Sequence, residues 1–492
     1  MTRYAMVADL ERCVGCQTCT AACRHANATS PAVQWRSVLD IEAGTYPDVS
    51  RTFVPVGCQH CADPPCMHVC PTTATRKRAD GIVTVDYDLC IGCAYCDVAC
   101  PYQARFKISE PGFAYGAPMK NEAAREDARR LGVSQKCTFC SDRIDYGLAN
   151  GLVPGVDPSA TPACVNSCIA DALHFGDVED TDSNVSKLLR ENTSFRMHQE
   201  LGTQPGFYYL HDKRHSGAQT PIATDAPVRG PGIEPKHQQH WDWKASANFL
   251  LGGSGAALFA FSVGFSSRTM SAVALALMAL GLGILFFKIG RPLRFLYVLR
   301  QPQRSWMARE AWLAGAFFPL AGFYLVTGSL GIAAAAVALA FLFAQAMILK
   351  ESKGIPAWRT PRIVPLIVLT DLAEGAGLLA LVMPVPLLLA ALVALRAWAW
   401  HAYFVSLERE GAPQRTLEVL RGCRTWMFWA GLMLSLVLIA VGFSSLAGVA
   451  IVATGWALKF ILVTRAAYQQ GFAIQRGATA LKPGWTYGRS AT

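Results

Sequence analysis

Residues 90–101 read CIGCAYCDVACP, a run of four cysteines spaced C-x2-C-x2-C-x3-C and followed by a proline. Three other runs repeat or vary this spacing, and together the four runs hold 16 of the 17 cysteines. The cysteines of the four runs, in chain order, are Cys13, Cys16, Cys19 and Cys23; Cys58, Cys61, Cys66 and Cys70; Cys90, Cys93, Cys96 and Cys100; and Cys137, Cys140, Cys164 and Cys168.

This spacing has a chemical reason. Three cysteines two residues apart wrap one [4Fe–4S] cubane, and the fourth cysteine, three residues on, points towards a neighbouring cluster. Sixteen thiolates therefore predict four [4Fe–4S] clusters. Structural zinc also takes four thiolates, but zinc sites use two separated C-x2-C pairs and gain nothing from the longer run. A disulfide framework is disfavoured, because the N-terminal segment has no apolar signal core and no twin arginine and so predicts the reducing cytoplasm.

The composition separates the chain into two unlike parts. Hydrophobic residues make up 52% of the chain and charged residues only 16%, below the roughly 25% typical of soluble domains. The cysteine runs precede nearly all of the long apolar stretches. Basic residues gather in short loops between those stretches, and no basic run is interleaved with aromatic residues in the cysteine-rich half. Nucleic-acid binding is therefore disfavoured.

We expect four segments: an iron–sulfur domain at 1–212, a linker at 213–244 rich in proline, glycine and polar residues, a membrane domain at 245–476, and a cytoplasmic tail at 477–492. The membrane domain contains eight apolar stretches of bilayer-spanning length. They lie at roughly 245–265, 270–287, 310–327, 331–349, 363–382, 385–405, 426–444 and 447–464.

The loops between these stretches alternate in charge. The loops 288–309, 350–362 and 406–425 are rich in lysine and arginine, whereas the loops of the opposite side hold Arg268 and no other charge. The positive-inside rule then predicts a multi-pass protein of the cell inner membrane whose iron–sulfur domain and basic loops are cytoplasmic. Docking of the basic loops on a negatively charged surface would add to this bias.

The four runs, in this order and with the long gap inside the fourth, resemble the iron–sulfur subunit of the dimethyl sulfoxide reductase family of molybdenum enzymes. The resemblance covers residues 1–212 and implies two back-to-back ferredoxin modules, which pair the first run with the fourth and the second with the third. It also implies four ligand sets. These are Cys13, Cys16, Cys19 and Cys168; Cys137, Cys140, Cys164 and Cys23; Cys58, Cys61, Cys66 and Cys100; and Cys90, Cys93, Cys96 and Cys70.

The second half resembles the membrane anchor subunit of the same reductases. The motifs that carry this resemblance are KIGRPLR at 288–294, SWMARE at 305–310, PAWRTP at 356–361 and TRAAYQQGFA at 464–473. Such anchors carry no haem and react with a quinone, here ubiquinone or menaquinone, on the side where the iron–sulfur subunit docks. Lys288 stands where relatives place a histidine used in quinol chemistry. His401 is the only histidine in the predicted spans, which also disfavours haem, because axial pairs need more.

Two acids lie well inside one predicted span. Asp371 and Glu374 are three residues apart and so share a helix face, about 12 Å from the cytoplasmic end of the helix. Arg396 lies at nearly the same depth on the next helix, so we expect an ion pair between these helices. Such residues are candidates for quinone contact or proton transfer, or they form a structural salt bridge without a chemical role. Lys459 is close enough to its helix end to snorkel to the surface.

The predicted fold is an α+β double ferredoxin-like domain followed by an all-α domain of eight transmembrane helices. The resemblance implies an electron-transfer and anchor subunit, which links a separate molybdopterin-containing catalytic subunit to the quinone pool in membrane lipid. A cytoplasmic domain favours sulfite oxidation with quinone reduction, as in membrane-bound sulfite dehydrogenases. The alternatives are a quinol-fed S-oxide or N-oxide reductase of the dimethyl sulfoxide type, and a ferredoxin-driven ion pump or transporter.

Overall fold

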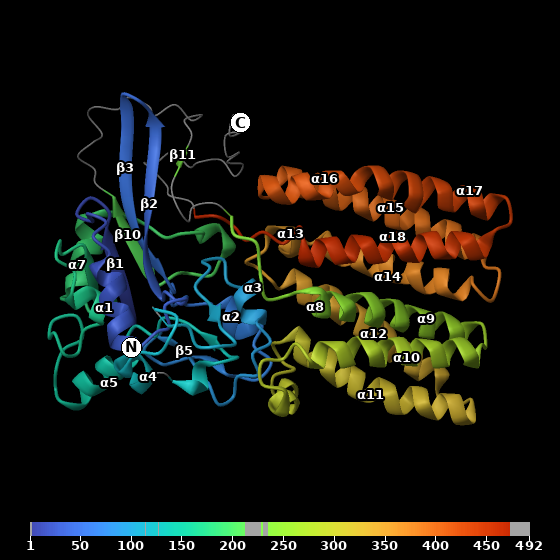
Figure 1. Ribbon diagram of the computed structural model, residues 1–492, viewed down its shortest axis with the longest axis horizontal. Helices are drawn as coiled ribbons and strands as arrows, with labels where there is room; N and C mark the ends of the chain where they lie inside the picture. The colour runs from blue at the N-terminus through green and yellow to red at the C-terminus, as the bar shows by residue number, and fades with distance from the viewer. Residues whose placement is uncertain (1, 114, 126, 212–227, 230–234, 473–492) are drawn as a thin grey trace.

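The computed structural model describes residues 2–113, 115–125, 127–211, 228–229 and 235–472. An iron–sulfur domain of short strands and helices lies beside a bundle of long helices that run along the long axis of the molecule (Figure 1). We call the end of the bundle that contacts the iron–sulfur domain the docking end. Most of the predicted linker and the whole predicted tail at 477–492 lie outside the described residues.

The iron–sulfur domain contains two similar halves. In one half, strand β1 (Tyr4–Asp9) leads into the first cysteine run and pairs antiparallel with β8 (Leu173–Asp177), which follows the fourth run. In the other half, β5 (Val83–Val85) leads into the third run and pairs antiparallel with β4 (Thr75–Lys77), which follows the second. The structure therefore pairs the runs first with fourth and second with third.

The backbone of the first and third runs is also repeated. Gly15 and Gln17 have φ angles of 70° and 60°, and Gly92 and Ala94, at the same offsets from the first cysteine of their run, have 72° and 60°. These left-handed residues turn the chain sharply around the space between the cysteines. Each run then enters a helix, α1 (Thr18–Asn27) or α3 (Tyr95–Val98), that carries its third cysteine.

Other elements complete the domain around these halves. The hairpin of β2 (Arg36–Thr45) and β3 (Asp48–Gly57) extends from one side and pairs with β11 (Val228–Arg229). β10 (Phe207–His211) extends the main sheet in the order β8-β1-β10-β9. The remaining elements are α2 (Pro65–His68), β6 (Phe106–Lys107), α4 (Lys120–Arg125), η1 (Ala128–Arg130), β7 (Ser134–Gln135), α5 (Ser141–Ala149), α6 (Ala163–Asn166), α7 (Asn184–Glu191), β9 (Thr193–Phe195) and η2 (Gln199–Leu201).

Eight long helices form the bundle within residues 243–464. They comprise α8 (Trp243–Ala247), η4 (Asn248–Gly252) and α9 (Gly253–Gly264) as one continuous helix; α10 (Arg268–Phe286); α11 (Trp306–Thr327); α12 (Gly331–Lys350); α14 (Ile363–Leu379); α15 (Pro386–Arg409); α16 (Gln414–Phe428), η6 (Trp429–Leu434) and α17 (Ser435–Ala440) as another; and α18 (Ser444–Thr464). Seven are long and apolar enough to cross a membrane, and the remaining helix, α14, is 17 residues long and carries the buried acids Asp371 and Glu374.

One predicted boundary is wrong. The basic stretch expected as a loop at 406–425 is helical from Gln414 onward, so Arg415, Arg421 and Arg424 lie on the first turns of α16. The polar residues of this stretch led to the wrong boundary between loop and helix. A helix that emerges from the bilayer can continue through polar residues, because its backbone hydrogen bonds are satisfied within the helix. Between helices at the docking end lie η5 (Pro292–Arg300) and α13 (Pro356–Arg359).

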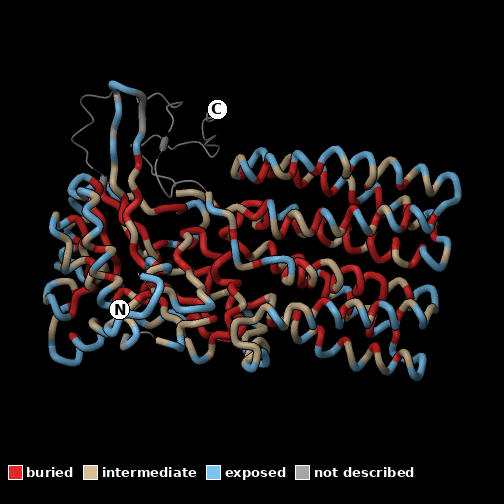
Figure 2. The backbone as a smooth tube through the Cα atoms, viewed as in Figure 1, coloured by how far each residue is buried: buried red, intermediate tan, exposed pale blue. Residues whose placement is uncertain are grey.

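The two domains share a hydrophobic core. Buried residues of the second and third cysteine runs pack with Trp241 and Trp358 at the docking end, so the buried region continues across the junction (Figure 2). Backbone bonds join the domains as well, because the Gly354 amide donates to the Val98 carbonyl at 3.1 Å and the Arg291 amide donates to the Ile91 carbonyl at 3.0 Å. This contact fixes the third cysteine run against the helices.

Candidate functional site

The first group of cysteines lies at the outer end of the iron–sulfur domain, away from the helices. Cys13, Cys16, Cys19 and Cys168 line one cavity. Cys16 is exposed, and Val14 beside it is 59% exposed. The backbone amide of Ala172 donates to the Cys168 sulfur at 3.2 Å. This set is the one that the resemblance implies for the first cluster.

A second cavity lies beside the docking end of the helices and is lined by Cys70, Cys90, Cys93 and Cys96. The Trp241 ring nitrogen donates to the Cys93 carbonyl at 3.3 Å, and Arg294 donates to the Cys90 carbonyl at 3.4 Å. This group is therefore held directly by residues of the helical half. It also matches an implied ligand set.

The other two groups are identified by their electrostatic neighbours. Burial raises the pKa of the Cys23 thiol, and three neighbouring thiols raise it further. Burial also raises the pKa of Cys61, again with three thiols adding to the rise. The neighbours of Cys23 are Cys137, Cys140 and Cys164, and those of Cys61 are Cys58, Cys66 and Cys100. These neighbours are the ones that the two remaining implied ligand sets require, and the assignment of all 16 cysteines to four clusters stays a prediction.

Contacts between groups give their order through the domain. Cys164 of the second group is an electrostatic neighbour of Cys19 in the outer group, and Cys137 is a neighbour of Cys58 in the third group. Arg105 adjoins both Cys66 of the third group and Cys96 of the group beside the helices. The four groups thus form a continuous series from the outer end to the docking end.

Two buried cations, Arg105 and Arg36, lie among the cysteine groups, and no sequence motif marks either of them. Arg105 is 4% exposed and donates to the Cys66 sulfur at 2.8 Å. Burial alone would lower the pKa of Arg105, but the surrounding thiolates outweigh burial and raise it. Arg36 is 1% exposed among thiols of the first two groups, and its Nε and Nη1 atoms have no hydrogen-bond partner among the described residues.

These observations fit [4Fe–4S] clusters. All 17 cysteines are free, and the four groups of four thiols supply the ligands that a cubane takes. The Arg36 nitrogens without a hydrogen-bond partner belong to a side chain that lies near the thiols of the first two groups, where a bound cluster would offer acceptors. Among the described residues, no three His, Cys, Asp or Glu side chains converge closely enough for one metal ion. A cubane is a larger body than one ion, so its ligands stand farther apart.

Lys288 lies just beyond α10 at the docking end. Its Nζ atom is buried without a hydrogen-bond partner among the described residues and sits 5.6 Å from the centroid of the Trp241 ring. Burial lowers the pKa of Lys288 to about 7, and nearby Lys107 contributes. His240 is an electrostatic neighbour of Lys288. The composition of 213–244 gave no sign that His240 and Trp241 pack beside the third cysteine run.

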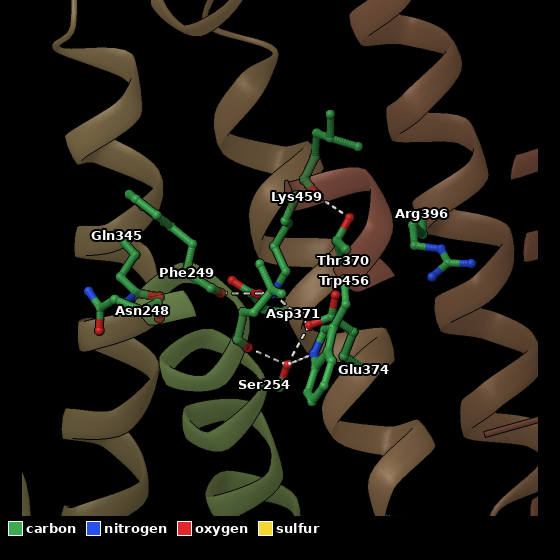
Figure 3. A network of polar contacts seen from close by, with 12 residues as sticks. Asn248, Phe249, Ser254, Gln345, Thr370, Asp371, Glu374, Arg396, Trp456 and Lys459 are labelled. Atoms are coloured by element: carbon green, nitrogen blue, oxygen red, sulfur yellow. Dashed lines mark hydrogen bonds and ion pairs between the residues drawn. The ribbon is translucent and has the colours of Figure 1, made fainter. Parts of the chain in front are cut away.

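The acids of α14 do not pair with Arg396, so the predicted ion pair is wrong (Figure 3). Lys459 of α18 binds both acids, with its Nζ atom 2.5 Å from Asp371 Oδ1 and 2.6 Å from Glu374 Oε2. Lys459 is 1% exposed, so the expected snorkelling is also wrong. Arg396 instead donates to the Gly431 carbonyl at 2.8 Å, and its other acceptors are likewise uncharged oxygens. Depth along a helix does not determine which way a side chain faces.

The fold and the four cysteine groups define an iron–sulfur electron-transfer protein. Residues 49–119 match the family model of the 4Fe-4S dicluster domain. A Halobacterium salinarum protein named as an iron–sulfur subunit of a dimethyl sulfoxide reductase is 41% identical over 44% of this chain and 82% of its own length. The B subunit of selenate reductase from Mesobacillus selenatarsenatis is 38% identical over 42% of this chain and 72% of its own length. The B subunit of sulfite dehydrogenase from Allochromatium vinosum is also 38% identical, over 43% of this chain and 83% of its own length. The chain belongs to the iron–sulfur subunit family of dimethyl sulfoxide reductase-type molybdopterin oxidoreductases.

Proposed function

We propose that this chain carries electrons between a molybdopterin-containing catalytic subunit and the quinone pool, and that its helical half anchors the complex in the membrane. The observation that carries the proposal is the series of four cysteine groups, which begins at an exposed outer end and finishes against the docking end of the helices. The clusters supply one-electron transfer when bound. The 16 cysteines of the four groups would hold them.

The outer end suits the catalytic subunit. Cys16 is exposed there, and two apolar side chains beside the cysteines, Val14 and Ile169, are 59% and 73% exposed. An apolar patch next to the first group would be covered when a partner docks, which would shorten the distance to the partner's redox centre. The relatives reported above, each named as one subunit of a reductase or dehydrogenase, support such a partner.

The docking end suits the quinone. Lys288 has a buried ammonium without a hydrogen-bond partner among the described residues, beside Trp241 and close to the last cysteine group. An ammonium there can donate to a quinone carbonyl and stabilise negative charge on its oxygen during reduction. The paired acids Asp371 and Glu374 lie deeper in the bundle, and Arg396 forms no contact with them, so Lys288 is the first quinone residue to test.

Sulfite oxidation coupled to reduction of ubiquinone or menaquinone is the reaction that we propose for the complex. The likeness to a subunit of a sulfite dehydrogenase supports it. The likeness to subunits of a selenate reductase and of a dimethyl sulfoxide reductase supports the second candidate, a quinol-fed reductase. The location of the catalytic subunit distinguishes the two candidates, because a sulfite-oxidising complex of this type would have its catalytic subunit in the cytoplasm.

We further propose that the protein spans the cell inner membrane with its iron–sulfur domain in the cytoplasm. The basic loops lie at the docking end, as the positive-inside rule requires for this orientation. They also bind the iron–sulfur domain, since Arg294 donates to the Tyr87 carbonyl at 2.7 Å. A reporter active only outside the cytoplasm should be active when inserted near Ser329 and silent when fused after Thr492. The reverse pattern would overturn the orientation.

The quinone role of Lys288 is tested by Lys288→Met, which keeps the side-chain length and removes the charge. Loss of one positioned donor should lower quinone-linked turnover about 10-fold or more. Transfer to an artificial acceptor that takes electrons directly from the clusters should persist. The matched control is Arg304→Met, which removes an exposed charge from the same loop and should leave both rates unchanged. Equal quinone turnover in Lys288→Met and wild type would contradict the quinone role and would mean that Lys288 only contributes to the positive charge of the cytoplasmic side.

A further inference from the structure

The centre of the bundle contains a buried group of charges that the electron path does not use. Lys459 contacts Asp371 and Glu374 as described above and also donates to the Phe249 carbonyl at 2.9 Å (Figure 3). The exposed fractions of the three charged side chains are 1%, 0% and 0%. Glycines make room for the acids, because a Cβ atom at Gly253 or Gly455 would lie within 2.4 Å of a carboxylate oxygen. This is a closely fitted site.

The buried charges of the bundle do not balance. The helices that pack against α14 contribute the buried cations Lys459 from α18 and Arg396 from α15, and the buried polar residues of α9 and α12 are the neutral Ser254, Ser262 and Gln345. The remaining buried acid of the described spans is Glu310 of α11, which accepts hydrogen bonds from the Asn248 and Gln345 amides at 3.0 and 3.1 Å.

Three carboxyl groups therefore face two cations within the described spans. A net negative charge at this depth is costly, and neutrality requires one additional proton on a carboxyl.

The hydrogen bonds around Ser254 indicate which carboxyl holds the additional proton. The Ser254 hydroxyl has one proton to donate. Its oxygen lies 2.6 Å from the Leu250 carbonyl, which can only accept, and it receives the Trp456 ring N–H at 2.8 Å. The Ser254 oxygen also lies 2.5 Å from Glu374 Oε2. Since the Ser254 proton is used by Leu250, the proton between Ser254 and Glu374 must come from Glu374.

We propose that Glu374 is a proton-binding residue in the centre of the membrane domain, and that Asp371 is the ionised partner of Lys459. The site holds one carboxyl proton, shielded by α9, α14 and α18. A proton held there would be available to the quinone reaction. That use rests on the proposed function, whereas the presence of the proton on Glu374 does not.

Two matched substitutions test the assignment through stability. Glu374→Gln replaces a protonated carboxyl with a neutral amide that can donate to Ser254 but cannot also accept from Lys459 at the same atom, so the melting temperature of the full chain should fall only slightly. Asp371→Asn removes the ionised partner of Lys459, so the melting temperature should fall clearly. A large fall for Glu374→Gln, with little change for Asp371→Asn, would overturn the proposal by exchanging the two roles.

Infrared spectroscopy of the purified full chain tests the proton directly and without turnover. Wild-type protein at neutral pH should show the carbonyl band of a protonated carboxylic acid, shifted in D2O and lost in Glu374→Gln. The control is Glu310→Gln, in which the band should remain. Absence of the band in wild type, or its loss in Glu310→Gln alone, would overturn the proposal. Because neither readout involves quinone, failure here is separable from failure of the electron-transfer function.

Discussion

Arg105 in the iron–sulfur domain and Lys459 in the helical bundle are both buried cations, but different kinds of partner neutralise them. Arg105 lies among thiols of two cysteine groups, so its charge is balanced by thiolates and by the clusters they would hold. Lys459 is balanced by carboxyl groups of the adjacent helix α14. The bundle thus supplies the counter-charges of Lys459 itself, whereas the iron–sulfur domain would depend on bound clusters for electrostatic balance.

The strongest test of this difference is removal of iron. Chelation should unfold the iron–sulfur domain, because metal-site binding energy is folding energy and the apo domain would keep buried cations without counter-ions. The bundle should remain folded, since Lys459 is neutralised by acids of the bundle itself. Hydrogen exchange should therefore rise across β1 and α1 and stay slow in α14 and α18. Simultaneous unfolding of both halves would show that the shared core at the docking end dominates instead.

A second prediction concerns the bundle alone. Lys459→Met should destabilise it by about 3–5 kcal/mol, because the Asp371 carboxylate would stay buried without a cation. Arg396→Met is the matched control. It leaves only uncharged oxygens without a donor, at a cost of about 1–3 kcal/mol. Thermal unfolding in detergent measures both, and a larger loss for Arg396→Met would contradict the assigned partners.

A third prediction concerns the iron–sulfur domain. Arg105→Gln should lower the midpoint potentials of the two clusters nearest the helices, because a buried cation stabilises the reduced and more negative state. Arg36→Gln should act on the outer pair instead. Redox titration followed by electron paramagnetic resonance resolves the four signals. The exposed Arg51→Gln serves as control, and an equal shift of all four potentials in any variant would contradict the local placement of these cations.

The smallest expected effect is a pH dependence at the boundary between the two regions. Because burial lowers the pKa of Lys288 to about 7, its ammonium is present below that pH and is lost above it. Quinone-linked turnover should therefore fall as pH rises through about 7. In Lys288→Met this step of the pH profile should disappear. A profile shared by wild type and variant would assign the titration to another group.

For two of the four groups, the cysteine runs predicted which thiols line one cavity. Spacing along the chain restricts which thiols can surround one cubane, and the resemblance supplied the exchange of the fourth cysteines between runs; the cavities lined by Cys13 and by Cys90 agree with both. No comparable pattern marks Arg36 or Arg105. They come from a strand and a loop outside the runs and reach the thiols only when distant segments pack together.

The spacing of the cysteines and the length of the apolar stretches are enough to predict the type of cofactor and the two-part fold. Ligand spacing and apolar length are local properties, and they dictate what a short segment can bind or cross. Packing between distant segments sets the order of the cysteine groups, the docking of Trp241 beside Cys93 and the pairing of Lys459 with Asp371 and Glu374. A uniformly apolar helix contains little information about its rotation around its own axis, so packing against its neighbours selects which charges meet.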